Sequence, residues 1–327
     1  MQQSLFDIPL SVTITSKGKE KTGANEKLKI NWSFSKMEML NSCSRKYYYY
    51  YFGGKKRKAK EDTNKDAIAF YSAMSNKHTS VGDIVHRCIA TFLRKRQKGQ
   101  DWNLDNLKWL ANEQLKDKIT HTIKLKNKEN TSNQFPISPI KELFDDMVNE
   151  NELIDFAKAK INQSLEYFYS SEDFKWIRES ASYNDTIVEE TAKFNLSNIH
   201  VDGKIDVAFH SDGKFHIVDW KTSYSEYEET SVQLLVYALW AVNKYEKEIE
   251  EICIHKAYLL DGKLETLEFS RKHIERAIAK IKQSVDEMML LEKYGADGII
   301  EAFDRCDERK VCQLCQFEKI CKPFKVN

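Results

Sequence analysis

The sequence lacks any apolar run long enough to cross a membrane. No stretch of the 327 residues approaches the roughly 18 consecutive apolar residues that a transmembrane helix requires. The first residues, Met1-Gln2-Gln3-Ser4-Leu5-Phe6-Asp7, also lack the basic start and apolar core of a secretory leader. We therefore expect a soluble, cytoplasmic protein that does not bind a membrane.

The sequence also has almost no net charge. Lys and Arg total 51 and Asp and Glu total 50, which leaves a formal net charge of +1. This balance neither indicates nor excludes a polyanionic partner, because attraction to a polyanion would come from local basic clusters or bound cations. With 41% hydrophobic residues, a chain of this length can bury a core of its own, as a folded enzyme requires.

The seven cysteines are not spread evenly, as they are in a secreted disulfide-rich domain. Three lie in the short pattern Cys312-x2-Cys315-x5-Cys321, with Cys306 just before them. In a reducing compartment this clustering predicts a metal site, completed by Cys306 or by a more distant cysteine. The spacing suits zinc and an iron-sulfur cluster equally.

Hydrophobic periodicity predicts an α/β order of elements. Residues 1–30 are polar and aperiodic, which indicates a flexible tail. Apolar residues from Val81 to Leu93 follow the spacing of a helix with one buried stripe. Residues from about 100 to 180 are interpreted as a helical insertion. The elements expected after it are strands at 186–194, 199–209 and 214–222, a helix at 229–245, strands at 252–260 and 264–269, and a helix at 270–291.

Strand alternation places Asp219 and Lys221 on one face of the strand at 214–222. The turn at 211–213 favours a hairpin, which would bring Asp206 of the preceding strand close to Asp219. Two carboxylates suit Mg²⁺ or Mn²⁺, and a neighbouring lysine would orient or deprotonate an attacking water. This set predicts phosphodiester hydrolysis, whereas the alternative is a surface ion pair of little consequence. Of Glu189 and Glu190, at most one faces the site, and we take Glu190 as the candidate.

Four segments follow the order of the motifs of RecB-like nucleases. They are Gly82-Asp83-Ile84-Val85-His86, Gly203-Lys204-Ile205-Asp206, Val218-Asp219-Trp220-Lys221-Thr222 and Gln233-Leu234-Leu235-Val236-Tyr237. The chain thus resembles this branch of the PD-(D/E)xK superfamily, although it has no proline before Asp206 and has Trp220 where relatives often have tyrosine. The resemblance implies an α/β fold with a restriction-endonuclease-like core, in which helices flank a central mixed sheet, over residues 31–327.

The same resemblance assigns roles to individual residues. It implies that His86, Asp206 and Asp219 hold a divalent metal and that the carbonyl of Trp220 adds a ligand. The catalytic set that it implies is Asp206, Asp219, Lys221, Gln233 and Tyr237. Spacing agrees for the last two, because residues four apart on a helix share a face.

Some RecB-like nucleases, of the AddB type, hold a [4Fe-4S] cluster on one cysteine before the nuclease motifs and three after them. Cys43 and the trio Cys312, Cys315 and Cys321 resemble that pattern. The resemblance implies that the region 306–321 closes on Cys43 through such a cluster. Cys306 stays open as the alternative fourth ligand, although Cys43 would close a much longer loop.

Basic residues surround five consecutive tyrosines, Tyr47 to Tyr51. Cations would bind phosphates, and some of the rings would stack on bases. Because five successive helical positions cover the whole circumference, other rings must be buried. The predicted nucleic-acid-binding residues are Arg45, Lys46, Lys55, Lys56 and Arg57.

Together these patterns predict a Mg²⁺- or Mn²⁺-dependent deoxyribonuclease, exonuclease-like on single-stranded or end-frayed DNA. The alternatives are a catalytically silent module that holds DNA ends in a repair, replication or defence complex, and a structural zinc protein. No G-x-x-x-x-G-K-[ST] phosphate loop occurs, so a helicase would be a separate partner. Gln2-Gln3-Ser4-Leu5-Phe6 resembles the peptide with which replication proteins bind a bacterial sliding clamp, a further predicted partner.

Overall fold

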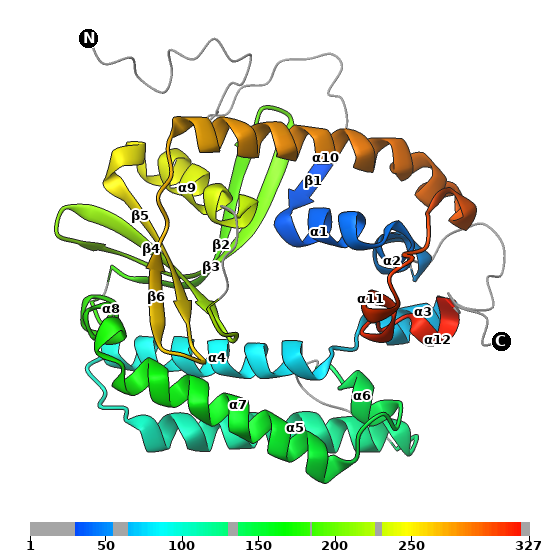
Figure 1. Cartoon of the computed structure of the whole chain (residues 1–327), viewed down its shortest axis with the longest axis horizontal. Helices are drawn as coiled ribbons and strands as arrows, with labels where there is room; N and C mark the ends of the chain where they lie inside the picture. Colours follow the sequence, from blue (N-terminus) through cyan, green and yellow to red (C-terminus); the bar gives the residue numbers. More distant parts are fainter. Residues whose placement is uncertain (1–29, 55–64, 130–136, 184, 226–230, 322–327) are drawn as a thin grey trace. The chain divides into compact units, whose positions relative to one another are not determined.

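The computed structural model of the chain describes residues 30–54, 65–129, 137–183, 185–225 and 231–321 (Figure 1). The chain divides into two units. The first, here the sheet unit, comprises residues 1–37, 93–100 and 172–289. The second, the helical unit, comprises residues 38–92, 101–171 and 290–327.

Within the described residues, the sheet unit contains a mixed sheet of six strands. They are β1 (Ile30–Ser33), β2 (Ile187–Leu196), β3 (Ile199–Ser211), β4 (Lys214–Lys221), β5 (Ile252–Tyr258) and β6 (Lys263–Thr266). The order is β1-β3-β4-β5-β6, with β2 paired along β3. The pairs β1–β3 and β4–β5 are parallel and the others antiparallel. This mixed sheet with flanking helices confirms the predicted fold class.

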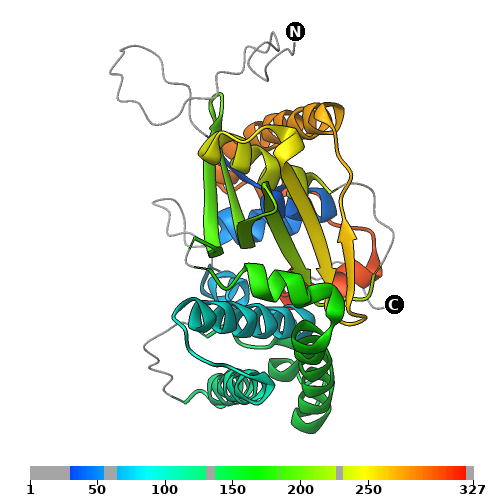
Figure 2. The ribbon, with the colours of Figure 1, turned by 90° about the vertical axis from the view of Figure 1, so that its left-hand side faces the viewer.

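Helices cover both faces of this sheet. Phe215 of β4 contacts Trp240 of α9 (Val232–Tyr245), with ring centroids 6.2 Å apart. The ring centroid of the next residue, His216, lies 5.2 Å from that of Trp176 of α8 (Lys175–Ser180). Because successive strand residues point to opposite faces, α9 and α8 pack on opposite sides. Figure 2 shows α9, in yellow, against the strands.

Two strands share one edge of β3. β1 pairs with β3 as far as Ser33 opposite Asp202, and β4 pairs with it only from Val218 opposite Val207. Residues 203–206 of β3 lie in the gap between these two partners. The ladder to β2 on the other edge is interrupted at the same level, because Glu189 has a left-handed backbone with φ of 54°. Asp206 therefore stands at an irregular point of an otherwise regular sheet.

The β3–β4 hairpin closes as the sequence predicted. Asp212 and Gly213, between the two strands, have φ angles of 49° and 72°. Positive φ at both central residues defines the turn whose twist matches antiparallel strands. This turn sets the register that carries Asp206 towards the end of β4.

The helical unit is built around α4 (Lys77–Gln97), whose C-terminal turns belong to the sheet unit. All seven apolar residues of its predicted stripe are buried. The remaining helices in the described part of this unit are α2 (Ser44–Tyr48), a π-helical turn (Tyr49–Gly53), α3 (Lys65–Ser72), α5 (Leu104–Lys126), α6 (Lys141–Phe144), α7 (Glu150–Ser170), a 3₁₀ turn (Ile300–Ala302), α11 (Arg309–Gln313) and α12 (Glu318–Cys321). Two more, α1 (Phe34–Ser42) and α10 (Arg271–Asp297), contribute residues to both units. Among all these described helices, none is both long and apolar enough to cross a membrane.

Several predictions fall outside the described residues. The predicted tail at 1–30 does so except for Ile30, which begins β1. The clamp-like peptide at residues 2–6 and the basic residues Lys55, Lys56 and Arg57 do so as well.

Two histidines form a buried chain of hydrogen bonds in the sheet unit. Nε2 of His216 lies 3.2 Å from the carbonyl oxygen of Ser211, and its Nδ1 lies 3.0 Å from Nε2 of His255. Nδ1 of His255 lies 2.9 Å from the hydroxyl of Thr266. Because a carbonyl only accepts, Nε2 of His216 donates to the carbonyl oxygen of Ser211. Burial, reinforced by His216, lowers the pKa of His255 to about 4.

We predict that acid destabilises the protein through His255. An unfolded histidine gains a proton near pH 6.5 and the folded one only near pH 4, so stability falls as pH decreases between these values. The shift corresponds to roughly 3 kcal/mol at the acid end of this window. Urea unfolding at pH 7, 6 and 5 should show a smaller loss for His255→Gln, whose side chain does not titrate but still offers a donor and an acceptor. The exposed control His210→Gln should follow the wild type, and equal pH slopes for all three proteins would refute the assignment.

Candidate active site

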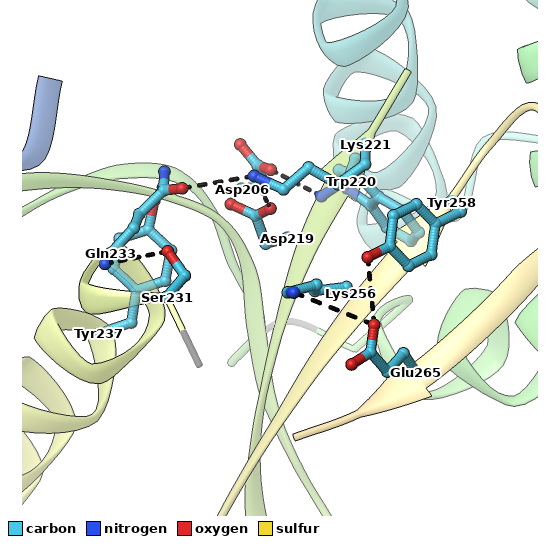
Figure 3. A network of polar contacts seen from close by, with 10 residues as sticks. All are labelled: Asp206, Asp219, Trp220, Lys221, Ser231, Gln233, Tyr237, Lys256, Tyr258 and Glu265. Atoms are coloured by element: carbon cyan, nitrogen blue, oxygen red, sulfur yellow. Dashed lines mark hydrogen bonds and ion pairs between the residues drawn. The ribbon is translucent and has the colours of Figure 1, made fainter. Parts of the chain in front are cut away.

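The sheet unit brings Asp206, Asp219 and Lys221 together (Figure 3). Both carboxylates are buried, with exposures of 8% for Asp206 and 4% for Asp219. Nζ of Lys221 lies 2.7 Å from Oδ2 of Asp219, so the two share a face as strand alternation predicted. Oδ2 of Asp206 accepts a hydrogen bond of 2.9 Å from the backbone amide of Trp220. This bond joins β3 to β4 where the two strands are not paired through their backbones, and it holds the end of β4 beside Asp206.

Gln233 links α9 to the catalytic lysine candidate. The Ser231 hydroxyl caps the helix by accepting a hydrogen bond of 3.3 Å from the backbone amide of Gln233. The Gln233 side chain accepts from Nζ of Lys221 at 3.3 Å and donates to the Tyr237 hydroxyl at 2.8 Å. Burial first, and then the charges of Asp219 and Asp206, raise the pKa of Tyr237 well above its usual value. Tyr237 therefore keeps its proton, and its hydroxyl accepts from the Gln233 side chain.

Glu189, and not the predicted Glu190, lies at this site. Carboxylate oxygens of Glu189 and Asp206 lie within 4.8 Å of each other, and Glu189 forms an ion pair with Lys204. Glu190 instead pairs with Lys244 of α9. The prediction of Glu190 was therefore wrong. The missing signal was the two-residue turn between β2 and β3, which sets Leu196 opposite Ile199. Continued along the two strands, this register puts Glu189 at the level of Asp206.

Lys256 is a second residue that sequence reasoning missed. It is 1% exposed, and it is the register partner of Asp219 on β5. In the sequence, the only indication of its role was that a lysine lies inside a segment otherwise typical of a buried strand. Figure 3 shows it between Asp219 and Glu265.

The remaining predicted site residues have less direct support. His86 lies on α4 in the helical unit, half-buried, and its metal-binding role stays a prediction. The Trp220 side chain is buried against Phe174, and the role of its carbonyl also stays a prediction. Arg45 donates from Nε to the carbonyl oxygen of Phe303 at 2.7 Å, so this predicted nucleic-acid contact also has a structural use.

The helical unit contains a pocket lined by cysteines. Its lining includes Cys43, Cys306, Cys312, Cys315 and Cys321. All seven cysteines of the chain lie in its described part, and all are free thiols. The backbone of residues 43–45 is bound to the segment before the trio, since the Arg45 amide donates to the carbonyl of Asp304 at 2.8 Å. Segments from both ends of the sequence thus meet at one pocket.

Thiol electrostatics distinguish Cys43 from Cys306. Burial raises the pKa of Cys312 to about 11, with added contributions from Cys306, Cys43 and the other two thiols of the pocket. Burial also raises the pKa of Cys315 and of Cys321, and Cys43 adds to the rise in each. Cys306 is among the main causes only for Cys312. Cys43 therefore contributes to the raised pKa of all three members of the trio, although Cys306 is the larger contribution for Cys312.

An ion-pair network connects two buried residues of the helical insertion to the segment between Cys315 and Cys321, where the side chains of Glu318 and Lys319 are 36% and 53% exposed. Oδ1 of Asp145 lies 2.7 Å from Nζ of Lys319, and its Oδ2 lies 3.5 Å from Nζ of Lys141. Nζ of Lys141 also lies 3.4 Å from Glu318. The side chains of Asp145 and Lys141 are only 1% and 2% exposed, so neither charge is screened by water. The network secures α12 to α6.

Residues 31–322 match a sequence model of one family, described as the PD-(D/E)XK nuclease superfamily. The match includes the acidic residues, Lys221, and the cysteine trio. It supports the nuclease resemblance at the level of the superfamily. No curated protein matches the sequence.

We predict that Asp145→Asn strongly destabilises the helical unit. The change preserves shape but leaves Lys141 and Lys319 without the buried anion between them, which should lower the free energy of unfolding by about 3 kcal/mol. Asp146→Asn is the matched control, because Asp146 pairs with Lys126 at the surface and is 76% exposed. Its effect should stay below about 1 kcal/mol in the same denaturant titration. Equal effects of the two changes would refute the role of the network.

Proposed function

Because the chain belongs to the PD-(D/E)XK nuclease superfamily, we propose that it is a metal-dependent nuclease with Asp206, Asp219 and Lys221 at its active centre. The observation that carries the proposal is the buried pair of carboxylates with the Lys221 ammonium 2.7 Å from one of them. An exposed ion pair, the alternative considered from the sequence, does not fit carboxylates that are less than a tenth exposed.

The acidic side chains fit a hard divalent cation, Mg²⁺ or Mn²⁺. Carboxylate oxygens are the ligands that these ions prefer, and neighbouring buried carboxylates repel one another unless a cation joins them. Asp206 and Asp219 would hold the ion, with Glu189 as an added candidate and His86 and the Trp220 carbonyl as the ligands implied by resemblance. When bound, the ion supplies a Lewis acid that activates water and offsets charge on the phosphate.

The chain's own groups orient Lys221. Asp219 fixes the ammonium on one side, and the Gln233 carbonyl oxygen fixes it on another. Tyr237 in turn holds the Gln233 amide, so the direction of the Lys221 side chain is set from α9. The lysine side chain is 31% exposed, which lets it meet a phosphate from solvent. As an ammonium, Lys221 would stabilise the developing negative charge and orient the attacking water, whereas only its neutral amine would accept a proton from that water.

DNA is the proposed substrate, single-stranded or frayed at an end, with exonuclease-like cleavage. Arg45 and Lys46, together with Lys55, Lys56 and Arg57, would contact phosphates. Among the neighbouring tyrosines, Tyr47, Tyr48 and Tyr49 are buried, whereas Tyr50 is 44% exposed. Tyr50 is thus the ring best placed to stack on a base. A separate helicase and a sliding clamp bound through residues 2–6 are the proposed partners.

A [4Fe-4S] cluster is the proposed occupant of the cysteine pocket, held by Cys43, Cys312, Cys315 and Cys321. The pocket's free thiols and the coupling of Cys43 to the whole trio support this set over one that contains Cys306. When bound, such a cluster cross-links residues that are 278 positions apart in the sequence, because Cys43 and Cys321 are its outermost ligands. That link would stabilise the fold mainly by restricting the unfolded chain.

We predict that Lys221→Ala abolishes metal-dependent cleavage without unfolding the protein. End-labelled single- and double-stranded DNA is incubated with anaerobically purified protein, with and without Mn²⁺ or Mg²⁺. Wild type should cut only with metal, and Lys221→Ala at least about a hundredfold more slowly. Lys263→Ala, a change at an exposed lysine of β6, is the control and should cut like wild type. If wild type binds DNA ends but never cuts, the chain is an end-binding module instead.

A second prediction separates Cys43 from Cys306. Anaerobically purified Cys43→Ser should lose most of the brown colour and iron, because a cluster requires four thiolates. Cys306→Ser should retain both at wild-type levels. If only the Cys306 variant loses iron, Cys306 and not Cys43 is the fourth ligand. If the wild type contains zinc, the iron-sulfur assignment is wrong.

A further inference from the structure

Two side chains in the last turns of α4, within the sheet unit, bind the backbone around the start of β2. Arg94 donates from Nη2 to the carbonyl oxygen of Val188 at 2.9 Å. Gln97 donates from Nε2 to the carbonyl oxygens of Thr186, at 2.9 Å, and Tyr183, at 3.2 Å. The two side chains share a face of α4, because residues three apart on a helix are neighbours. The proposed catalytic scheme uses neither of them.

Protection of a sheet edge explains the contacts of Gln97. Within the described residues, β2 pairs only with β3, so its other edge carries backbone groups without a strand partner. Side chains of a neighbouring helix can satisfy such groups. Both acceptors of Gln97 precede β2, which begins at Ile187. Gln97 therefore secures the chain as it enters the sheet.

Arg94 binds a peptide group with a more particular position. The carbonyl of Val188 belongs to the peptide that leads into Glu189, and Glu189 has the left-handed φ of 54°. A residue with a side chain keeps this conformation only where the surrounding contacts hold it. Rotation about φ sets how that peptide is turned relative to the Glu189 side chain. A hydrogen bond to the Val188 carbonyl therefore also holds the direction of the Glu189 side chain.

The direction of Glu189 matters because its carboxylate reaches the acidic site. Carboxylate oxygens of Glu189 and Asp206 lie within 4.8 Å of each other, and the Glu189 side chain is only 11% exposed. Lys204 pairs with the carboxylate of Glu189 but is itself 65% exposed, so it can turn into solvent when a metal ion binds. The carboxylate end of Glu189 thus has a replaceable partner, whereas its backbone end is held by Arg94.

We propose that Arg94 is a positioning residue that aims the Glu189 carboxylate at the divalent-cation site by holding the left-handed backbone of Glu189. The inference rests on the proposed function, since it treats Glu189 as a ligand of that ion. Loss of a positive charge would by itself favour the binding of a cation nearby. Loss of the Arg94 hydrogen bond should instead weaken metal binding, so the two effects have opposite signs.

Mn²⁺ titrations of the full chain test the proposal, with bound and free ion measured by electron paramagnetic resonance. Wild type should bind Mn²⁺ at a site that Asp206→Asn abolishes. Arg94→Met, which keeps an apolar stem but cannot donate, should bind Mn²⁺ about tenfold more weakly, and Glu189→Gln at least as weakly. Circular dichroism at the temperature of the titration shows that each variant is folded.

A double-mutant cycle separates positioning from a general loss of structure. In the Glu189→Gln background, Arg94→Met should cause no further loss of affinity, because no carboxylate is left to aim. Gln97→Met is the matched control, since it removes hydrogen bonds from the same helix face to the same part of the chain. It should lower the melting temperature and leave Mn²⁺ affinity at the wild-type value. Lys98→Met, a loss of charge at an exposed neighbouring position, should also leave that affinity unchanged.

The role of Arg94 fails, and the metal-dependent nuclease stands, if Arg94→Met binds Mn²⁺ like wild type or if Glu189→Gln does. It fails equally if Arg94→Met costs as much affinity in the Glu189→Gln background as in wild type, or if Gln97→Met costs as much as Arg94→Met. A wild type without any Mn²⁺ binding that depends on Asp206 would refute the proposed function as well.

Discussion

The hydrogen bond from the Trp220 amide to the Asp206 carboxylate is the contact on which the acidic site depends. It forms in the stretch of β3 that pairs with neither β1 nor β4. There the Trp220 amide donates to the Asp206 side chain, whereas in a regular ladder it would donate to a backbone carbonyl of β3. The bond stabilises the end of β4, and through it the positions of Asp219 and Lys221. Without such a gap, the carboxylate would lie over a closed sheet and its partner amide would already be used.

Much of this site was predictable because it depends on local periodicity. Alternation along β4 was enough to put Asp219 beside Lys221, and the turn at Asp212 and Gly213 set the hairpin. Glu189 was not predictable from alternation alone, because its left-handed backbone interrupts the ladder and only the β2–β3 register identifies its partner. Lys256 was missed for another reason: a charge inside an apolar strand has meaning only when the residues on neighbouring strands are known.

The cysteines show the same division between sequence and structure. Their spacing predicted one site but left the fourth ligand and the metal open. The structure brings five thiols to one pocket, including Cys43, which spacing alone could not place there and which only the family resemblance had suggested. The helical insertion carried no recognisable motif. Its buried Asp145 pairs both with Lys141 of the insertion and with Lys319 from the far end of the sequence, and the second pair could be recognised only in the structure.

That dependence limits how the protein can be redesigned or can diverge. An insertion joined to a fold only through its two ends can be shortened or exchanged at little thermodynamic cost. Here the residue after α6, Asp145, supplies the anion that Lys319 and Lys141 share, so a graft that removed α6 and Asp145 would remove Lys141 as well and leave Lys319 without its counter-ion. We therefore expect the insertion and the segment around Lys319 to change together among related sequences.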